Sequence, residues 1–190
     1  MIRELIRGAR LLACAIALSG GAACWGQSKH TAKPAVVLEE KPADALARAV
    51  RHQILVLPFY SVFDTVSFAM DGDKVVLTGQ VVRPSLKASA EAAVKSLEGI
   101  RSVENRIEIL PVSASDDELR RAVYRAIFED KTLQRYAIQA VPPIHIIVKN
   151  GSVTLTGSVD SASDKALATT RASLAPNAGN VANNLVVVAR

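Results

Sequence analysis

The sequence predicts an α+β fold of two tandem αββαβ units, each a three-stranded mixed sheet with two helices on one face. Two observations carry this prediction. The segment VVLTGQV at 75–81 returns as VTLTGSV at 153–159, with five of seven positions identical and an offset of 78 residues. Downstream, SVENRIEIL at 102–110 aligns with NVANNLVVV at 180–188 at the same offset, as expected of an internal duplication.

Each copy is preceded by an alternating apolar run that ends in a turn, Asp-Gly at 71–72 and Asn-Gly at 150–151. An alternating run on either side of such a turn predicts a β-hairpin. The distance from the turn glycine to Gly79 is one residue longer than the distance to Gly157, so we expect one inserted residue in the first turn. A helix joins the second strand to the third, which predicts a parallel pair with a right-handed crossover.

The first unit is predicted at residues 44–111. Its first helix, at 43–57, has one apolar face and ends at Pro58. The remaining elements, two strands, a helix that ends at Gly99 and a third strand, are expected at 65–70, 75–81, 84–99 and 103–109.

The second unit is predicted at residues 114–190. Ser115 to Glu118 forms a capping-box pattern with acids in the first turn, which predicts a helix start there. Pro142 and Pro143 delay the first strand to Ile144. The remaining strand, helix and strand are expected at 153–159, 161–174 and 181–188.

Two pairs of repeated residues are predicted to serve the fold. Alternation places Gly79 and Gly157 on the inward face, where a strand glycine suggests the close approach of a helix backbone. Asn105 and Asn183 also point inward by the same phase. They could line a polar pocket, but we favour amides that bond a loop backbone where the strand begins.

Residues 1–23 are expected to be a secretory signal, with a basic start, an apolar run at 11–18 and small residues before the cleavage site. The apolar run is shorter than the roughly 20 residues needed to span a bilayer. Cleavage after Ala23 would expose Cys24, and the preceding Gly-Ala-Ala resembles a bacterial lipobox with Gly21 in place of the usual Leu. Lipidation of Cys24 and ordinary cleavage beside an incidental cysteine both stay open. Residues 24–43 are expected to be a flexible tether.

The segments GDKVVLTGQV with SVENRI, and NGSVTLTGSV with NVANNL, resemble the BON domain, an envelope module of bacterial osmotic-stress and nodulation proteins. The resemblance covers residues 44–190 in two copies, although APNAGNV at 175–181 stands where a Pro-Gly turn is usual. It implies an exported protein in the periplasm, or a lipoprotein anchored to the outer membrane through Cys24. It also implies association with phospholipid surfaces in envelope maintenance or stress response, with no catalytic residues.

The sequence predicts no catalytic, cofactor or metal site. His30, His52 and His145 have no second histidine, cysteine or acid at ligand spacing. The acids at 71–73 lack the spacing of an EF-hand loop and are better explained by a turn. The net charge of +5 falls to +3 without residues 1–23, which is well below the charge expected of a nucleic-acid binder. We therefore expect a binding module that is not an enzyme and does not bind nucleic acid.

A basic and aromatic cluster on and after the first helix of the second unit is the candidate lipid-binding site. Cations beside interfacial aromatics suit an anionic phospholipid surface. A solvated helix face, balanced by neighbouring acids, is the alternative. The candidate residues are Arg120, Arg121, Tyr124, Arg125, Phe128 and Arg135.

The second hypothesis is a chaperone-like module that binds envelope proteins or peptides. The edges of three-stranded sheets can accept an added strand. The outward positions Ile147, Val186 and Val188 also make the outer face of the second sheet more apolar than that of the first. That face could therefore bind a partner or pack on the other unit.

Overall fold

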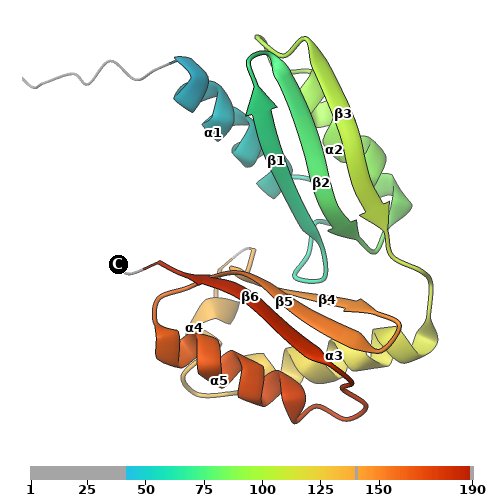
Figure 1. Cartoon of the computed structure of the whole chain (residues 1–190), viewed down its shortest axis with the longest axis vertical. Coiled ribbons are helices and arrows are strands. Elements are labelled where there is room, and N and C mark those ends of the chain that lie inside the picture. The colour runs from blue at the N-terminus through green and yellow to red at the C-terminus, as the bar shows by residue number, and fades with distance from the viewer. Residues whose placement is uncertain (1–41, 140, 189–190) are drawn as a thin grey trace, which may run out of the picture. The chain divides into compact units, whose positions relative to one another are not determined.

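The alternating runs of the sequence form strands, and the apolar helical faces pack on the sheets they make. The structure, a computed structural model, describes residues 42–139 and 141–188, so Cys24 and the predicted signal lie outside the described residues. It contains two αββαβ units, the second with one additional short helix, which confirms the predicted fold class (Figure 1). The elements are α1 Pro42–Leu55, β1 Thr65–Asp71, β2 Lys74–Val81, α2 Pro84–Lys95 and β3 Ser102–Ile109, then α3 Ala114–Phe128, α4 Gln134–Ala137, β4 Ile144–Lys149, β5 Ser152–Val159, α5 Ala162–Ser173 and β6 Val181–Val187.

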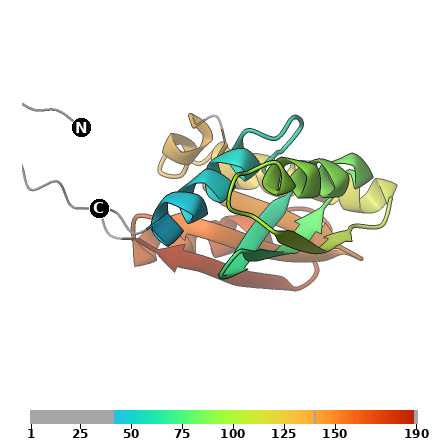
Figure 2. The same ribbon diagram turned by 90° about the horizontal axis from the view of Figure 1, so that it is seen from above.

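The two sheets have the same order and the same register. The strands lie in the orders β1-β2-β3 and β4-β5-β6, with an antiparallel first pair and a parallel second pair in each. Leu77 pairs with Asn105, and Leu155 pairs with Asn183, so the offset of 78 residues persists across the strands. In the first unit, α1 and α2 lie side by side on one face of the sheet (Figure 2).

The expected insertion in the first hairpin turn is absent, so that prediction was wrong. Asp71 pairs with Lys74 and Lys149 pairs with Ser152, which keeps the offset of 78 through both turns. The turns differ in where the glycine stands and in whether one or both turn residues have positive φ. Gly72 comes first in its turn with φ 60, whereas in the other turn residue 150 is an asparagine with φ 51, followed by a glycine with φ 75. Asparagine tolerates positive φ, so each turn has the geometry that a two-residue hairpin requires.

Gly79 and Gly157 lie against a neighbouring strand rather than a helix, which corrects the predicted reason for them. Their φ angles are 129° and 112°, a region that side chains of L-residues rarely adopt. A Cβ added to Gly79 would lie 2.1 Å from the carbonyl oxygen of Thr65. A Cβ added to Gly157 would lie 1.9 Å from the carbonyl oxygen of Pro143. Both glycines therefore permit close approach of the first strand of their hairpin.

Helix α3 begins before the predicted capping box. Its N-cap is Ser113 rather than Ser115, and the Ser113 side chain accepts a hydrogen bond from the backbone N–H of Asp116. The Asp116 carboxylate is buried and accepts from the backbone N–H groups of Asn150 and Gly151 at 2.9 and 2.8 Å. This acid, which the sequence assigned only to the helix start, also holds the β4–β5 turn.

The loop at 56–64 joins α1 to β1 and also contacts the second unit. Val62 is 7% exposed and belongs to the hydrophobic core of the second unit. Its carbonyl oxygen accepts from the backbone N–H of Ile146 at 2.8 Å, so one backbone donor on the outer edge of β4 is hydrogen-bonded. The ammonium of Lys149 also lies 2.6 Å from the carboxylate of Glu108. The candidate sites are built around this loop.

The predicted apolar outer face of the second sheet is partly buried and partly exposed. Ile147 on β4 is 2% exposed, whereas Val186 and Val188 are 61% and 51% exposed. Only the β6 side of that face is therefore open. None of the helices in the described ranges is long and apolar enough to cross a membrane.

Candidate functional site

The outer face of α3 carries two exposed arginines around an aromatic floor. Arg121 and Arg125 are exposed, and Tyr124 between them is half-buried. The ring of Tyr124 packs against Phe128 at 4.8 Å and Phe63 at 6.1 Å between centroids. A hollow of about 320 Å³ is lined by Arg121, Tyr124, Arg125 and Phe63. Two guanidinium groups thus border an apolar hollow, an arrangement suited to an anionic head with an apolar body.

Two predicted members of this site are buried, so their placement on the exposed face was wrong. Arg120 is 3% exposed, pairs with Asp117, and donates from Nη2 to the carbonyl oxygen of Val148 at 2.7 Å. Phe128 is 5% exposed and belongs to the core of the second unit. The buried face of α3 is wider than its aliphatic residues indicated, because it includes these two side chains.

Arg135 is engaged away from α3. Its Nη2 lies 2.5 Å from the carboxylate of Asp164, and its guanidinium lies 5.0 Å from the ring centroid of Tyr136. The Tyr136 hydroxyl donates to the same carboxylate at 2.9 Å. This network ties α4 to α5 and fixes the guanidinium of Arg135, whose side chain is 49% exposed, outside the α3 surface.

Two residues of the first unit extend the α3 surface and were missed from the sequence. Phe59 is 70% exposed with φ 68, and the guanidinium of Arg83 lies 5.0 Å from its ring centroid. A second hollow, of about 340 Å³, includes both residues and shares Phe63 and Arg121 with the first. An aromatic residue after a helix-ending proline was the available signal. The arginine–aromatic surface consists of Phe59, Phe63, Arg83, Arg121, Tyr124 and Arg125.

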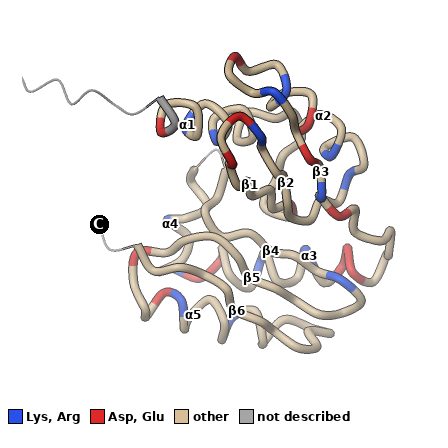
Figure 3. The backbone as a smooth tube through the Cα atoms, turned by 45° about the horizontal axis from the view of Figure 1, so that its top comes forward, with Lys and Arg blue, Asp and Glu red and all other residues tan. Residues whose placement is uncertain are grey.

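The charges outside this surface are mixed in sign. Figure 3 shows acidic and basic positions interspersed over both units. Several of the cations pair with acids, such as the exposed Arg101 with Asp73 at 2.8 Å and the half-buried Arg171 with Asp130 at 2.6 Å. No group of three or more potential metal ligands occurs within residues 42–139 and 141–188.

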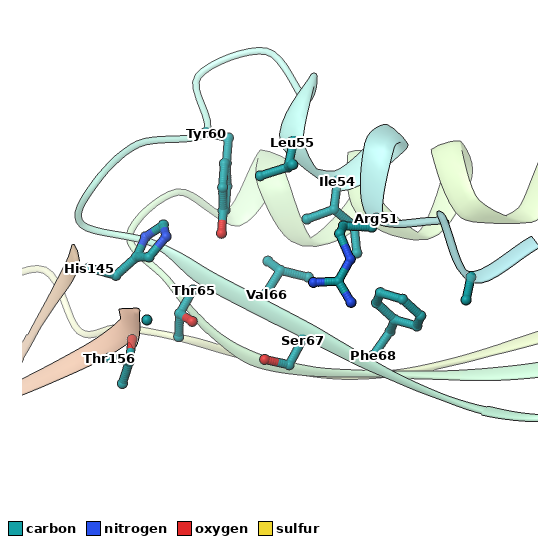
Figure 4. A pocket seen from close by; sticks show the side chains of 12 residues that line it. Arg51, Ile54, Leu55, Tyr60, Thr65, Val66, Ser67, Phe68, His145 and Thr156 are labelled. Atoms are coloured by element: carbon teal, nitrogen blue, oxygen red, sulfur yellow. The ribbon is translucent and has the colours of Figure 1, made fainter. Parts of the chain in front are cut away.

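A separate cavity of about 520 Å³ lies between the end of α1, β1 and the beginning of β4 (Figure 4). Its polar groups stand on both sides of an apolar middle. The guanidinium of Arg51 lies 5.8 Å from the ring centroid of Phe68, and the rings of Tyr60 and His145 are 5.8 Å apart. Burial raises the pKa of Tyr60 to about 12 and lowers the pKa of His145. The lining residues are Ala47, Arg51, Ile54, Leu55, Tyr60, Thr65, Val66, Ser67, Phe68, His145, Thr156 and Gly157.

The repeated asparagines bond helices instead of loops or a ligand pocket. Asn105 donates to the carbonyl oxygen of Lys87 in α2, and Asn183 donates to that of Lys165 in α5, each at 2.8 Å. The predicted loop partner was therefore wrong, while the bonds themselves join elements within each unit.

Comparison with protein families matches the BON domain to residues 65–111 and again to residues 115–189. No curated protein matches the chain. Two solved structures of CdsD, a structural protein of the type III secretion system of Chlamydia trachomatis, one of them its C-terminal domain, are 13% identical with TM-scores of 0.31. The matches cover 77% and 75% of this chain, and 93% and 97% of those chains. Similarity at this TM-score supports no argument about function.

Proposed function

The chain belongs to the BON domain family, and on that premise we propose that it is a non-enzymatic cell-envelope module that binds anionic phospholipid surfaces. The single observation that carries the proposal is the arginine–aromatic surface. Its exposed cations, Arg83, Arg121 and Arg125, stand beside the exposed ring of Phe59 and the half-buried ring of Tyr124. Cations attract lipid phosphates, and aromatic rings insert at the headgroup level.

The charges of this surface should account for most of the binding at low salt. Each cation near an anionic membrane contributes about 1 kcal/mol, and salt screens that contribution. The aromatic contribution is insensitive to salt, because it depends on buried apolar area. Binding to vesicles of anionic lipid should therefore fall steeply, but not to zero, as the salt concentration rises.

The test is co-sedimentation of the full-length chain with vesicles of anionic or of neutral phospholipid. Replacing Arg121 and Arg125 together by Gln should weaken anionic-vesicle binding by roughly 1.5 decades at low salt. The matched control replaces Lys95 and Arg101 by Gln, two exposed cations outside the surface, and so removes the same charge. If both double variants bind alike, or if the first binds as the wild type does, this surface is not the membrane contact.

Protein or peptide binding is a second candidate function, supported by the β6 edge. Strand β6 lies at one edge of its sheet, and Val186, Val187 and Val188 there are 61%, 42% and 51% exposed. Val186→Lys should abolish suppression of aggregation of an unfolded client protein, because an edge lysine blocks strand addition. Retention of that activity in Val186→Lys would exclude this edge.

We further propose that the chain is exported and resides in the periplasm, either free or anchored to the outer membrane through lipidated Cys24. The support is the signal-like composition of residues 1–23 and the resemblance of the next positions to a lipobox. Cys24→Ser should move an anchored protein from the membrane fraction to the soluble periplasm. Unchanged fractionation, with a mature N-terminus other than Cys24, would exclude the anchor.

A further inference from the structure

We propose that the cavity between α1, β1 and the beginning of β4 binds the C-terminus of an extended polypeptide that ends in an apolar residue. The cavity combines a strand edge, apolar walls and a cation, Arg51, that forms no ion pair with a described residue (Figure 4). These are the groups needed for a peptide main chain, an apolar side chain and a terminal carboxylate. The proposal is independent of phospholipid binding, because the lining residues are not those of the arginine–aromatic surface.

The strand edge is supplied by β1. Four consecutive residues, Thr65 to Phe68, line the cavity, and β1 lies at the edge of its sheet. Asp71 and Lys74 flank the two-residue turn and form a hydrogen-bonded pair, so alternation along β1 directs the backbone polar groups of Val66 away from β2. Backbone groups alternate in direction along a strand, so those of Phe68 also face the open edge. An extended segment beside Phe68 would therefore find a donor and an acceptor.

The carboxylate site is supplied by Arg51. Its side chain is exposed, and no carboxylate in the described part of the chain pairs with it. The Phe68 ring beneath the guanidinium restricts its orientation, and a planar guanidinium binds a carboxylate through two hydrogen bonds. A free C-terminus is the polypeptide group that meets this geometry at the end of a strand.

The walls and the far end complete the site. Ile54, Leu55 and Val66 offer apolar contact, and Leu55 is still 45% exposed, so a ligand side chain would bury it further. At the other end, His145 and Thr156 are cross-strand partners. His145 Nδ1 and Thr156 Oγ1 are buried without hydrogen-bond partners among the described residues. A peptide group there would satisfy atoms that are costly to leave unpaired.

The test measures binding of a fluorescein-labelled hexapeptide, Gly-Ser-Val-Thr-Val-Phe, to the full-length chain by fluorescence anisotropy. The peptide with a free carboxylate should bind saturably, and its C-terminal amide should bind about tenfold more weakly. Methylation of the amide nitrogen of the terminal Phe should also weaken binding, because it removes a strand hydrogen bond. Arg51→Gln should weaken binding of the free acid about tenfold and make acid and amide bind equally.

Variants of the two other candidate surfaces test where the peptide binds. The Arg121→Gln, Arg125→Gln double variant should bind anionic vesicles roughly 1.5 decades more weakly and keep peptide binding. Val186→Lys should also keep peptide binding. Equal binding of acid and amide by the wild type, unchanged binding by Arg51→Gln, or loss of binding in Val186→Lys would overturn the proposal. Saturable binding of laurate in place of the peptide would overturn it too, and would assign the cavity to a fatty acid.

Discussion

The side-chain amide of Asn183 donates to the backbone carbonyl oxygen of Lys165 at 2.8 Å, which ties β6 to α5. Asn105 makes the same bond to Lys87 at the same distance, which ties β3 to α2. The Asn105 Oδ1 also accepts from the backbone N–H of Ile107 at 3.1 Å. The duplication has thus preserved one strand-to-helix connection at equivalent places in both units.

Replacing Asn183 by Leu should lower the free energy of unfolding by about 2 kcal/mol, because the change removes the bonds that join β6 to α5 and leaves the backbone N–H of Leu185 without its partner. Asn105→Leu should have a similar effect. Urea denaturation followed by circular dichroism measures both. The control is Asn184→Leu, next in sequence and exposed, which should change stability by less than about 0.5 kcal/mol. Equal losses in Asn183→Leu and Asn184→Leu would contradict the role of the amide.

Substitution by aspartate should affect stability differently at the two asparagines. The amide of Asn105 also donates to the carboxylate of Glu91 at 3.1 Å, whereas Asn183 has the hydroxyl of Thr169 in that place. Asn105→Asp would set two carboxylates together, so it should destabilise the protein more than Asn183→Asp at pH 7. Equal urea midpoints at pH 7 would argue against this contact.

Gly79→Ala should be among the most destabilising single substitutions in the first unit. The added Cβ would lie 2.1 Å from the Thr65 carbonyl oxygen, at a φ of 129°. We expect a loss of about 3 kcal/mol or more in the free energy of unfolding. Gly72→Ala is the matched control, because its φ is also positive but nothing lies within 4 Å of the added atom. Its cost should stay near 1–2 kcal/mol, and thermal unfolding of both variants would show whether the clash decides the difference.

The features predictable from the sequence were those set by local pattern. Alternation, turns and the helix between the second and third strands are local signals, and they determine both hairpins and the parallel pairs. The turn insertion was wrongly inferred because glycine was taken as the marker of the turn, while Asn150 can also adopt positive φ. The buried positions of Arg120 and Phe128 could not be predicted, since they depend on what packs against the edges of α3.

In the candidate binding surfaces, too, only the residues that are close in sequence could be predicted. Arg121, Tyr124 and Arg125 are close in sequence and were found as a group. Phe59 joins them only because the loop at 56–64 places Val62 in the core of the second unit. The same loop brings Tyr60 to His145 at the cavity of Arg51. Contacts of this kind follow from tertiary packing, which has no local signal in the sequence.

Arg120→Ala should destabilise the protein without a selective effect on vesicle binding. The side chain is 3% exposed, and its loss would leave the carbonyl oxygen of Val148 unpaired and remove the partner of Asp117. We expect a loss of about 3 kcal/mol in the free energy of unfolding. Arg121→Ala, one residue along and exposed, should do the reverse and weaken vesicle binding with little change in stability. A stable Arg120→Ala variant with weakened vesicle binding would instead show that Arg120 contacts the membrane.

Stability should fall as the pH drops through the range of histidine titration, because of His145. Burial lowers the pKa of this imidazole, with Tyr60, Asp64 and Arg51 as the titratable groups around it. The unfolded chain, with a histidine pKa of about 6.5, then binds more protons than the folded chain. The free energy of unfolding therefore decreases below about pH 6.5 and stops decreasing below the folded pKa. Urea midpoints at pH 7.5 and 5.5 should differ less in His145→Gln than in the wild type. A pH-dependent difference in His145→Gln as large as that of the wild type would contradict this role of His145.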